Sequence, residues 1–308
     1  MITPQFPTAE MDEVGARFDG RFGICVEDLS SGANYTSCGH VRFPTASVCK
    51  ISVMIELFRQ VEEGRLALDE RRRYDGGTIS HGGSTLLDMP GEGPELTLHE
   101  YCERMITVSD NNATDFILGI LGEGAVDAML DDMGYHQTRT PVTMGRYHYR
   151  MAGLGDDVPT GPEGDRLKEE RKDAGFDYGS LSYQGVPENN VAAPAEMADM
   201  LKKIQRGEML SPASSAAMLD LLRRGRDRRM IPRHLKPEIE IAHKYGSSGI
   251  IKGDVGIVYL PTGPLVVTGF GLTVPGGAAE QGSRAIGRIT RLAAEALSPG
   301  SVVAEEDD

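Results

Sequence analysis

The sequence predicts an α+β fold, with an antiparallel sheet built from both chain ends and an inserted all-helical lobe between them. Apolar runs of strand length lie in the first 40 residues, and runs rich in β-branched residues and glycine return after residue 240. Between these regions, apolar residues recur at helical spacing. A chain of 308 residues, 40% of them hydrophobic, is long enough for one domain with a large core.

The amino-terminal part of the sheet is expected to be a hairpin. Residues 22–27 (FGICVE) and 34–37 (NYTS) have the composition of short strands. The segment 28–32 (DLSSG) between them consists largely of turn-forming residues. We therefore expect two adjacent strands before the first motif of the chain.

The first long helix is expected over residues 47–63. Ile51, Met54 and Phe58 recur at helical spacing, and Gly64 follows as a stop signal. Most of its other positions are apolar too, so we expect this helix to be buried. Further helices, each with one apolar face, are expected at 98–108, 113–121, 123–133, 195–205 and 212–224.

The carboxyl-terminal part of the chain is expected to complete the sheet. Residues 256–260 and 265–272 are rich in β-branched residues and glycine, and the segment 261–264 (PTGP) between them has the residues of a hairpin turn. A last helix is expected at 283–297. The order of elements is thus strands, helices, strands and helix.

This order predicts a single domain over residues 1–308 with two interleaved lobes. The sheet lobe is expected at about 1–42 and 225–298, and the helical lobe at about 43–224. Within the helical lobe, residues 145–190 are expected to form a long loop, because glycine, proline and charged residues dominate there.

Only one short helix, at 166–172, is expected inside the segment 145–190. Long irregular segments in compact domains are either functional loops or disordered linkers. We interpret this one as a functional loop because it holds more aromatic residues than a disordered linker does. They are Tyr147, His148, Tyr149, Phe176, Tyr178 and Tyr183.

The charge of the chain argues against nucleic acid as a partner. The net charge of −14 and the pI near 5.0 repel polyanions, and no lysine- and arginine-rich run with interleaved aromatics offsets them. No apolar stretch has the length of a membrane helix, and the amino terminus lacks the basic start and apolar core of an export signal. We expect no membrane partner, and a cytoplasmic protein unless a leader was removed.

The four cysteines do not indicate a metal site or a disulfide framework. Cys25, Cys38, Cys49 and Cys102 have no C-x-x-C spacing and no neighbouring histidine cluster. We expect them to be buried free thiols. The sequence predicts no metal and no other cofactor.

Ser47 and Lys50 form an S-x-x-K motif where the loop 42–46 (RFPTA) runs into the buried helix. Residues three apart lie on one face of a helix, so the two side chains are expected to lie close together. A serine hydroxyl needs a base at neutral pH, and a lysine amine becomes one when burial or nearby charge lowers its pKa. Alone the motif is weak, because a helix-capping serine and a surface lysine give the same pattern.

Two further motifs follow in order, S-D-N at 109–111 and K-Y-G at 244–246. With Ser47 and Lys50, they resemble the S-x-x-K, S-D-N and K-T-G motifs of class A β-lactamases and penicillin-binding proteins. The third motif is imperfect, because Tyr245 stands where threonine or serine is usual. The resemblance covers nearly the whole chain and implies a β-lactamase/transpeptidase-like fold.

The resemblance also implies roles for individual residues. Ser47 would attack a carbonyl carbon, Lys50 would take its proton, and Ser109 would relay a proton to the departing nitrogen. Asn111 would hold the side-chain amide of the substrate, and Lys244 would bind its carboxylate.

Further substrate-binding residues are implied around the third motif. The backbone amides of Ser47 and Ser247 would form the oxyanion hole. Tyr245 replaces a residue that usually contacts the substrate carboxylate, so a different mode of recognition is expected. The arginine that some members place near the strand end is missing, and Lys252 is the candidate to replace it.

The segment 145–190 lacks the Glu-x-x-x-Asn pair with which β-lactam-destroying members activate water. Counting back from Pro194 as in the family places Asp177 at the glutamate position and Leu181 at the asparagine position. Glu188 is the second candidate for the base, and a solvated loop carboxylate is the alternative for both. Release of the acyl group is therefore expected to be slow.

Three functions fit these observations. The first is a class A β-lactamase-like serine hydrolase that acts through an acyl-enzyme on β-lactam or related amide bonds, as in antibiotic resistance or β-lactam catabolism. The second is a D-amino-acid-specific peptidase, amidase or esterase, favoured by the missing glutamate and by Tyr245. The third is a noncatalytic penicillin-binding relative, in which Ser109 and Asn111 only cap a helix and Lys244 is an exposed strand residue. In each case the expected partner is a small-molecule or peptide-like substrate.

Overall fold

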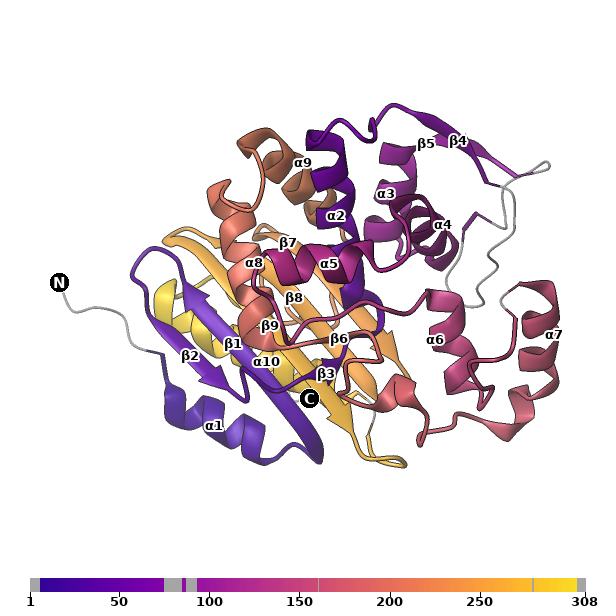
Figure 1. The fold of residues 1–308 in the computed structure, drawn as a ribbon. Helices are drawn as coiled ribbons and strands as arrows, with labels where there is room; N and C mark the ends of the chain where they lie inside the picture. Colours follow the sequence, from indigo (N-terminus) through magenta and orange to yellow (C-terminus); the bar gives the residue numbers. More distant parts are fainter. Residues whose placement is uncertain (1–5, 75–84, 87–92, 160, 279, 304–308) are drawn as a thin grey trace. The chain divides into compact units, whose positions relative to one another are not determined.

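The computed structural model describes residues 6–74, 85–86, 93–159, 161–278 and 280–303. The chain divides into two compact units (Figure 1). The sheet unit consists of Met1–Val48 and Ala192–Asp308, and the helical unit consists of Cys49–Val191.

A five-stranded antiparallel sheet with strand order β2-β1-β9-β8-β7 forms the centre of the sheet unit (Figure 1). Its strands are β1 (Gly20–Asp28), β2 (Asn34–Ser37), β7 (Glu240–Ser248), β8 (Ile251–Leu260) and β9 (Gly263–Thr273). Strand β1 pairs with β9 along its whole length, so the two ends of the chain meet inside one sheet. The predicted α+β class and the predicted origin of the sheet are confirmed.

Helices cover both faces of this sheet. The Thr268 hydroxyl on β9 donates to the Pro194 carbonyl at the start of α8 (Pro194–Arg206), at 2.8 Å. A Cβ on the next residue, Gly269, would lie 2.8 Å from Ile286 of α10 (Gln281–Leu297). Because successive strand residues point to opposite faces, one face of the sheet is covered by α8 and the other by α10. We name these the α8 face and the α10 face.

The α10 face carries the main core of the sheet unit. Each fully buried aliphatic side chain there stabilises the fold by about 1.5–3 kcal/mol. Helix α1 (Thr8–Ala16), which the sequence pattern did not indicate, packs against α10. Buried members of this core include Ile24, Val26, Val258, Leu265, Val267, Ile286, Ile289 and Ala293.

Helices α8 and α9 (Pro212–Arg223) group with the sheet and not with the other helices. Helix α8 packs against β1 and β9, and α9 packs against β7. The second segment of the sheet unit begins at Ala192 and therefore includes both helices. The lobe boundaries expected near residues 42 and 224 stay a prediction. That residues 1–308 fold as a single domain stays a prediction.

Helix α2 (Lys50–Glu62) lies at the centre of the helical unit, and in the sequence it directly follows the 3-10 turn η1 (Ala46–Cys49). Ten of its 13 residues are buried, as predicted for the helix at 47–63. Helix α2 packs against α3 (Leu98–Thr107), α4 (Asn111–Leu121) and α5 (Ala125–Asp132), which match the helices expected there. The described residues also form the short strands β3 (Phe43–Pro44), β4 (Arg71–Arg73), β5 (Glu95–Thr97) and β6 (Val191–Ala192).

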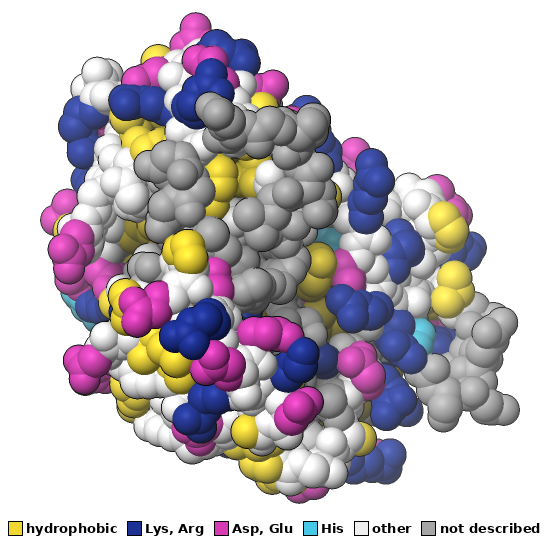
Figure 2. All heavy atoms as spheres, turned by 90° about the vertical axis from the view of Figure 1, so that its right-hand side faces the viewer, with side chains coloured by type: hydrophobic (Ala, Val, Ile, Leu, Met, Phe, Trp, Pro, Cys, Tyr) yellow, Lys and Arg dark blue, Asp and Glu magenta, His cyan; other side chains and the backbone are white. Residues whose placement is uncertain are grey.

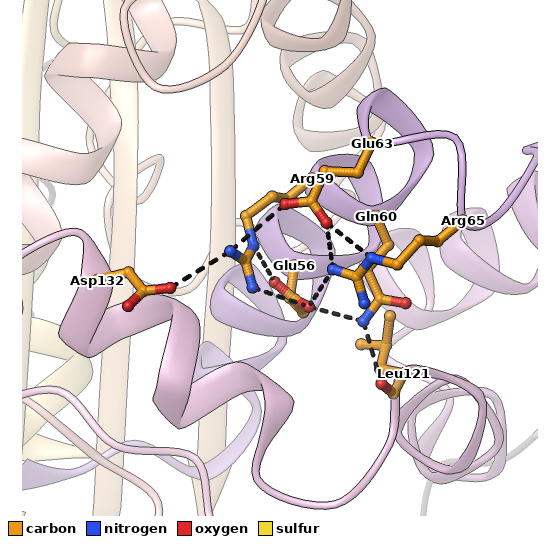
Figure 3. A network of polar contacts seen from close by, with 7 residues as sticks. All are labelled: Glu56, Arg59, Gln60, Glu63, Arg65, Leu121 and Asp132. Carbon is orange, nitrogen blue, oxygen red and sulfur yellow. Dashed lines mark hydrogen bonds and ion pairs between the residues drawn. The ribbon is translucent and has the colours of Figure 1, made fainter.

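A network of hydrogen bonds and ion pairs lies in the carboxyl-terminal half of α2, away from Lys50 (Figure 3). The fully buried Glu56 carboxylate accepts hydrogen bonds from Arg59 Nε and Gln60 Nε2, both at 2.7 Å. Gln60 Nε2 also donates to the Leu121 carbonyl of α4 at 3.0 Å, and Arg59 lies 3.5 Å from Asp132 of α5. A buried carboxylate needs such partners, and through Gln60 and Arg59 the network joins α2 to α4 and α5.

The segment 145–190 is more regular than we expected. It contains most of α6 (Met144–Met151), all of α7 (Pro162–Glu170) and the short 3-10 turns η2 (Lys172–Ala174) and η3 (Leu181–Tyr183). The prediction of one helix at 166–172 was therefore wrong. The sequence pattern missed α6 because capping groups contribute to fixing its start, and one of them, Asp115 of α4, lies far away in the sequence.

Three of the four cysteines are buried free thiols, as predicted, but Cys38 is exposed. Cys38 follows the end of β2 in a turn with φ of 49°, where its side chain has no core to enter. The expectation of a buried thiol was wrong at this position.

Within the described part of the chain, no helix combines the length and the apolar composition needed to cross a membrane. On the face drawn in Figure 2, lysine and arginine side chains are interspersed with aspartate and glutamate. That face therefore carries charges of both signs.

Candidate active site

The loop before Ser47 is fixed by aromatic packing and by a strained turn. Phe43 is buried and stacks on Phe270 of β9, with ring centroids 6.1 Å apart. Ala46 has φ of 44°, a left-handed conformation that is uncommon for a residue with a side chain. Val48 N donates to Thr45 O at 3.0 Å across this turn. Ser47 itself is half-buried and stands where the chain enters its helical course.

Strand β7 lies directly against this turn at Gly246. A Cβ at this position would lie 2.4 Å from the Thr45 carbonyl oxygen and 2.9 Å from Ser47 N. Only glycine fits such a close approach of two backbones. The glycine of the K-Y-G motif therefore brings the end of β7 next to the backbone of Ser47.

Lys50 is completely buried, and its ammonium group has three hydrogen-bond acceptors. Nζ donates to the Ser109 carbonyl at 2.7 Å, to Ser109 Oγ at 3.1 Å and to Asn111 Oδ1 at 2.7 Å. Burial lowers the pKa of Lys50 from its ordinary value to about 8, although Cys49, Asp110 and Asp115 act in the opposite direction. Lys50 can therefore lose its proton near neutral pH, as a general base must.

Asp110, the middle residue of the S-D-N motif, fixes the turn that carries its two neighbours. Its Oδ1 accepts from Ala113 N at 2.9 Å and caps α4, and its Oδ2 accepts from Thr85 N at 2.7 Å and Leu86 N at 3.0 Å. Ser109 is held with φ of 59°, again left-handed. Such strain persists only where surrounding contacts enforce it, and it often marks functional sites.

Asp115 is a buried carboxylate near this group that sequence reasoning missed. It lies on α4 one turn after Asn111 and accepts from Met144 N at 2.5 Å and Gly145 N at 2.8 Å. Burial raises its pKa to about 6, although these two amides and Lys50 act in the opposite direction. The available signal was an aspartate within an apolar helix (NNATDFILGIL).

The register of the sheet places neighbouring residues of the third motif on different faces. Gly246 pairs with Gly253, which pairs with Phe270, and Phe270 shares the α8 face with Thr268. Lys244 lies two residues before Gly246 in the strand, so its side chain also leaves the backbone on the α8 face. At the sheet edge its buried amine donates to the Tyr245 carbonyl at 2.9 Å.

Tyr245, Ser247 and Lys252 lie on the α10 face by the same register. Tyr245 packs partly against the core there, and burial is the main cause that raises its pKa. Lys252 Nζ donates to Ser247 Oγ at 2.8 Å and lies 3.2 Å from the Glu280 carboxylate. The Lys252 side chain thus links the end of β7 to the start of α10. Substrate contact by these three residues stays a prediction.

The two candidate water-activating carboxylates lie on the surface of the helical unit. Asp177 is exposed, and its Oδ1 accepts from Gly179 N of the same turn at 3.0 Å. Glu188 is also exposed, and its backbone carbonyl, not its carboxylate, accepts from Arg150 Nη1 at 2.8 Å. Neither assignment as the base is decided by these contacts, so both stay predictions.

No metal centre competes with this arrangement in the described part of the chain. Groups of three or more histidine, cysteine, aspartate or glutamate side chains with metal-binding geometry are absent among those residues.

Comparison with known proteins finds β-lactamases and PBP-A among the relatives of this chain. "Beta-lactamase L2" of Stenotrophomonas maltophilia is 27% identical over 205 residues, which are 66% of this chain and 56% of that protein. A β-lactamase structure from Sphaerobacter thermophilus has a TM-score of 0.74 and 27% identity, covering 94% of this chain and 95% of that one. A point mutant of PBP-A, solved as an acyl-enzyme complex with penicillin G, has a TM-score of 0.72 and 25% identity, covering 96% and 98%.

The alignment with the L2 enzyme spans little more than half of that protein's length, whereas the structural matches span nearly whole chains. The resemblance that the three motifs indicated is confirmed. The family model described as "Beta-lactamase enzyme family" matches residues 7–297, and the chain belongs to this family.

Proposed function

We propose that the protein is a class A β-lactamase-like serine hydrolase that acts through an acyl-enzyme on β-lactam or related amide bonds. The observation that supports this most strongly is the buried Lys50, with its three hydrogen-bond partners and a pKa near 8. A surface lysine or a salt-bridged structural lysine would remain protonated at neutral pH. An amine that can deprotonate, three residues after a half-buried serine, suits nucleophile activation.

Acylation would use residues of all three motifs. Ser47 Oγ attacks the acyl carbonyl carbon while its proton passes to Lys50 Nζ. As the tetrahedral intermediate collapses, Ser109 Oγ passes a proton to the departing nitrogen, and Lys50 reprotonates Ser109. Asn111 accepts from Lys50 and would also hold the amide of the substrate side chain.

The negative charge of the intermediate would be held by two backbone amides. Ser47 N lies against Gly246, and Ser247 follows Gly246 in β7, so both proposed donors belong to a single backbone contact in the sheet unit. Amides fixed before the reaction need no reorganisation when charge develops, which is why oxyanion holes lower the barrier. Lys244, on the α8 face, would attract the carboxylate of the substrate, and substrate contact by Tyr245 and Lys252, on the α10 face, stays a prediction.

Release of the acyl group requires an activated water. Asp177 is our first candidate for its base and Glu188 the second. Because both carboxylates are exposed, we propose that acylation is faster than release.

One sample tests the proposal in two ways. Nitrocefin turnover measures hydrolysis, and intact mass after incubation with penicillin G or a fluorophosphonate measures the covalent adduct. We expect one adduct per chain, located on the peptide that contains Ser47. Ser47→Ala should abolish it, whereas Ser52→Ala, which changes a buried serine on α2, should retain it. Labelling that survives Ser47→Ala would refute the assignment of the nucleophile.

The exposed carboxylates and Tyr245 favour a second candidate, a hydrolase of D-amino-acid peptides, amides or esters. Such an enzyme would form a long-lived adduct with penicillin and turn over an acyl-D-alanyl ester faster than nitrocefin. The ratio of the two turnover rates separates the candidates. A chain that shows neither an adduct nor turnover would instead be a noncatalytic relative.

A further inference from the structure

Asp115 shares a face of α4 with the residue that binds the proposed base. Residues four apart lie one above the other on a helix, and Asn111 accepts a hydrogen bond from Lys50 at 2.7 Å. The Asp115 side chain is 2% exposed, and α2 packs against α4. The Asp115 carboxylate favours the protonated form of Lys50, and Lys50 in turn lowers the pKa of the Asp115 carboxyl.

The two oxygens of Asp115 hold a second element in place. They accept from the amides of Met144 and Gly145, which are the first two residues of α6 and have no partner within their own helix. At the other end of α6, the Met151 carbonyl accepts from Asp177 N at 2.8 Å. A chain of bonds within the helical unit therefore runs from Asn111 along α4 to Asp115, and along α6 to Asp177.

Among the groups that raise the pKa of Lys50, Asp115 has a smaller effect than Cys49 and Asp110. The Cys49 thiol lies on the preceding turn, and Asp110 lies at the start of α4. Asp110 belongs to the S-D-N motif and has several backbone donors, so removing it would disturb the Ser109 turn. Asp115 can be altered without touching that turn.

Charged groups on the surrounding helices are engaged away from the pair. Arg104 of α3 donates to Thr85 Oγ1 at 2.9 Å, and Arg146 of α6 donates to the Val158 carbonyl at 2.7 Å. Asp127 of α5 is partly buried and accepts from Thr140 N at 2.7 Å. Arg139, not Lys50, is the cation that acts on Asp127.

We propose that Asp115 is a positioning residue for the catalytic lysine: its buried carboxylate favours the protonated form of Lys50, and its two oxygens fix the start of α6. The proposal rests on the proposed function, because it takes Lys50 as the base that activates Ser47. A carboxylate near an ammonium favours the protonated amine. Removing this charge therefore makes Lys50 lose its proton at lower pH.

The test compares three substitutions. Asp115→Asn keeps the shape, removes the charge and leaves one oxygen to accept from α6, so the rise of the acylation rate with pH, its acid limb, should begin at lower pH than in the wild type. Asp115→Glu keeps the charge, so the limb should stay near its wild-type position even if the plateau rate falls. Asp127→Asn removes a comparable carboxylate away from Lys50 and should leave the limb unmoved.

Two readouts separate this proposal from the proposed function. Stopped-flow acylation by nitrocefin gives the acid limb, and NMR titration of ¹³C-lysine-labelled protein, with Lys50→Arg for assignment, gives the protonation of Lys50 without any substrate. A shift in both supports the proposal. A rate that falls equally at every pH, with an unmoved NMR titration, would show that Asp115 only holds α6 and would overturn it.

Two further outcomes keep the two hypotheses distinct. If wild-type Ser47 is never acylated but the NMR titration of Lys50 still moves in Asp115→Asn, the proposed function fails and the electrostatic coupling stands. If Asp115→Asn does not fold, Lys50→Met provides the reciprocal measurement. The Asp115 carboxyl should then titrate at higher pH than in the wild type, and an unchanged titration would overturn the proposal.

Discussion

Two regions of the helical unit carry the two proposed halves of the reaction, and they differ in how their groups are held. Lys50 is fully buried, with three hydrogen bonds at 2.7–3.1 Å. Asp177 and Glu188 are exposed, and water competes for their carboxylates. The groups proposed for acylation are thus held in position by protein contacts before substrate binds, whereas the carboxylates proposed for acyl release are free to exchange contacts with water.

The largest effect is expected from the buried region. Lys50→Met removes the base, so the acylation rate should fall by about 10²- to 10⁴-fold. Ser109→Ala should also slow acylation, but the double variant should lose less than the product of the two factors, because the two groups act on one proton path. Stopped-flow kinetics with nitrocefin measures all three. If the double variant loses the product of the two factors, Lys50 and Ser109 act independently, and the proposal of one shared proton path is wrong.

The acylation rate should also depend strongly on pH. Lys50 acts as a base only when deprotonated, and its pKa in the folded protein is about 8. The rate should therefore rise with pH and reach its plateau above pH 8, and at pH 6 it should be about 100-fold lower than the plateau. A pH profile of single-turnover acylation checks this. A flat profile between these values would mean that another group takes the proton.

Gly246→Ala tests the contact between β7 and the serine turn. The added methyl group would lie 2.4 Å from the Thr45 carbonyl oxygen, so β7 or the turn must shift. We expect acylation to fall by about 10²-fold, the effect of a misplaced reacting group. Gly119→Ala is the matched control, because a Cβ there meets nothing within 4 Å and alanine favours the α4 helix. Equal activity of the two variants would contradict the assigned role of the contact.

A smaller effect is expected from the exposed carboxylates. A chromogenic β-lactam should give a burst near one equivalent per chain, followed by a slower steady rate. Asp177→Asn should lower the steady rate by about tenfold or less and leave the burst unchanged, since a solvated carboxylate is a poorly positioned base. Glu188→Gln should do so instead if that residue is the base. A linear trace, unaffected by either change, would mean that release uses another group, with Lys50 as the next candidate.

The smallest effect on activity is expected from the network at the far end of α2. Glu56→Ala leaves Gln60 and Arg59 without their buried acceptor and should lower the free energy of unfolding by about 2 kcal/mol. Glu56→Gln keeps one acceptor oxygen and should lose less. Chemical denaturation measures both values, and acylation rates at low temperature should remain within about twofold of wild type. A large loss of rate without a loss of stability would show that this network also shapes the Lys50 site.

Sequence patterns identified residues that the structure brings together around Lys50, because local rules govern their positions. Helical spacing predicted the buried helix that carries Lys50, and the spacing of the motifs indicated Ser109 and Asn111. Asp115 was missed, because its importance comes from amides of α6, about 30 residues farther along the chain. No local pattern encodes such a contact. Likewise the close approach of Gly246 to the Ser47 turn depends on sheet register, which single-sequence reasoning does not supply.

One of the bonds to Lys50 has a consequence for how this site can change during evolution. The Ser109 carbonyl, a backbone atom, accepts from Nζ at 2.7 Å, so no replacement of the Ser109 side chain removes that acceptor. The left-handed φ of 59° is the condition for keeping it, and glycine or asparagine tolerates that conformation readily. A lineage that replaces the Ser109 hydroxyl, which we propose as the proton relay, therefore still keeps a backbone acceptor for Lys50. Substitutions at position 109 can therefore change how the leaving group is protonated while Lys50 keeps its bonds to the Ser109 carbonyl and to Asn111.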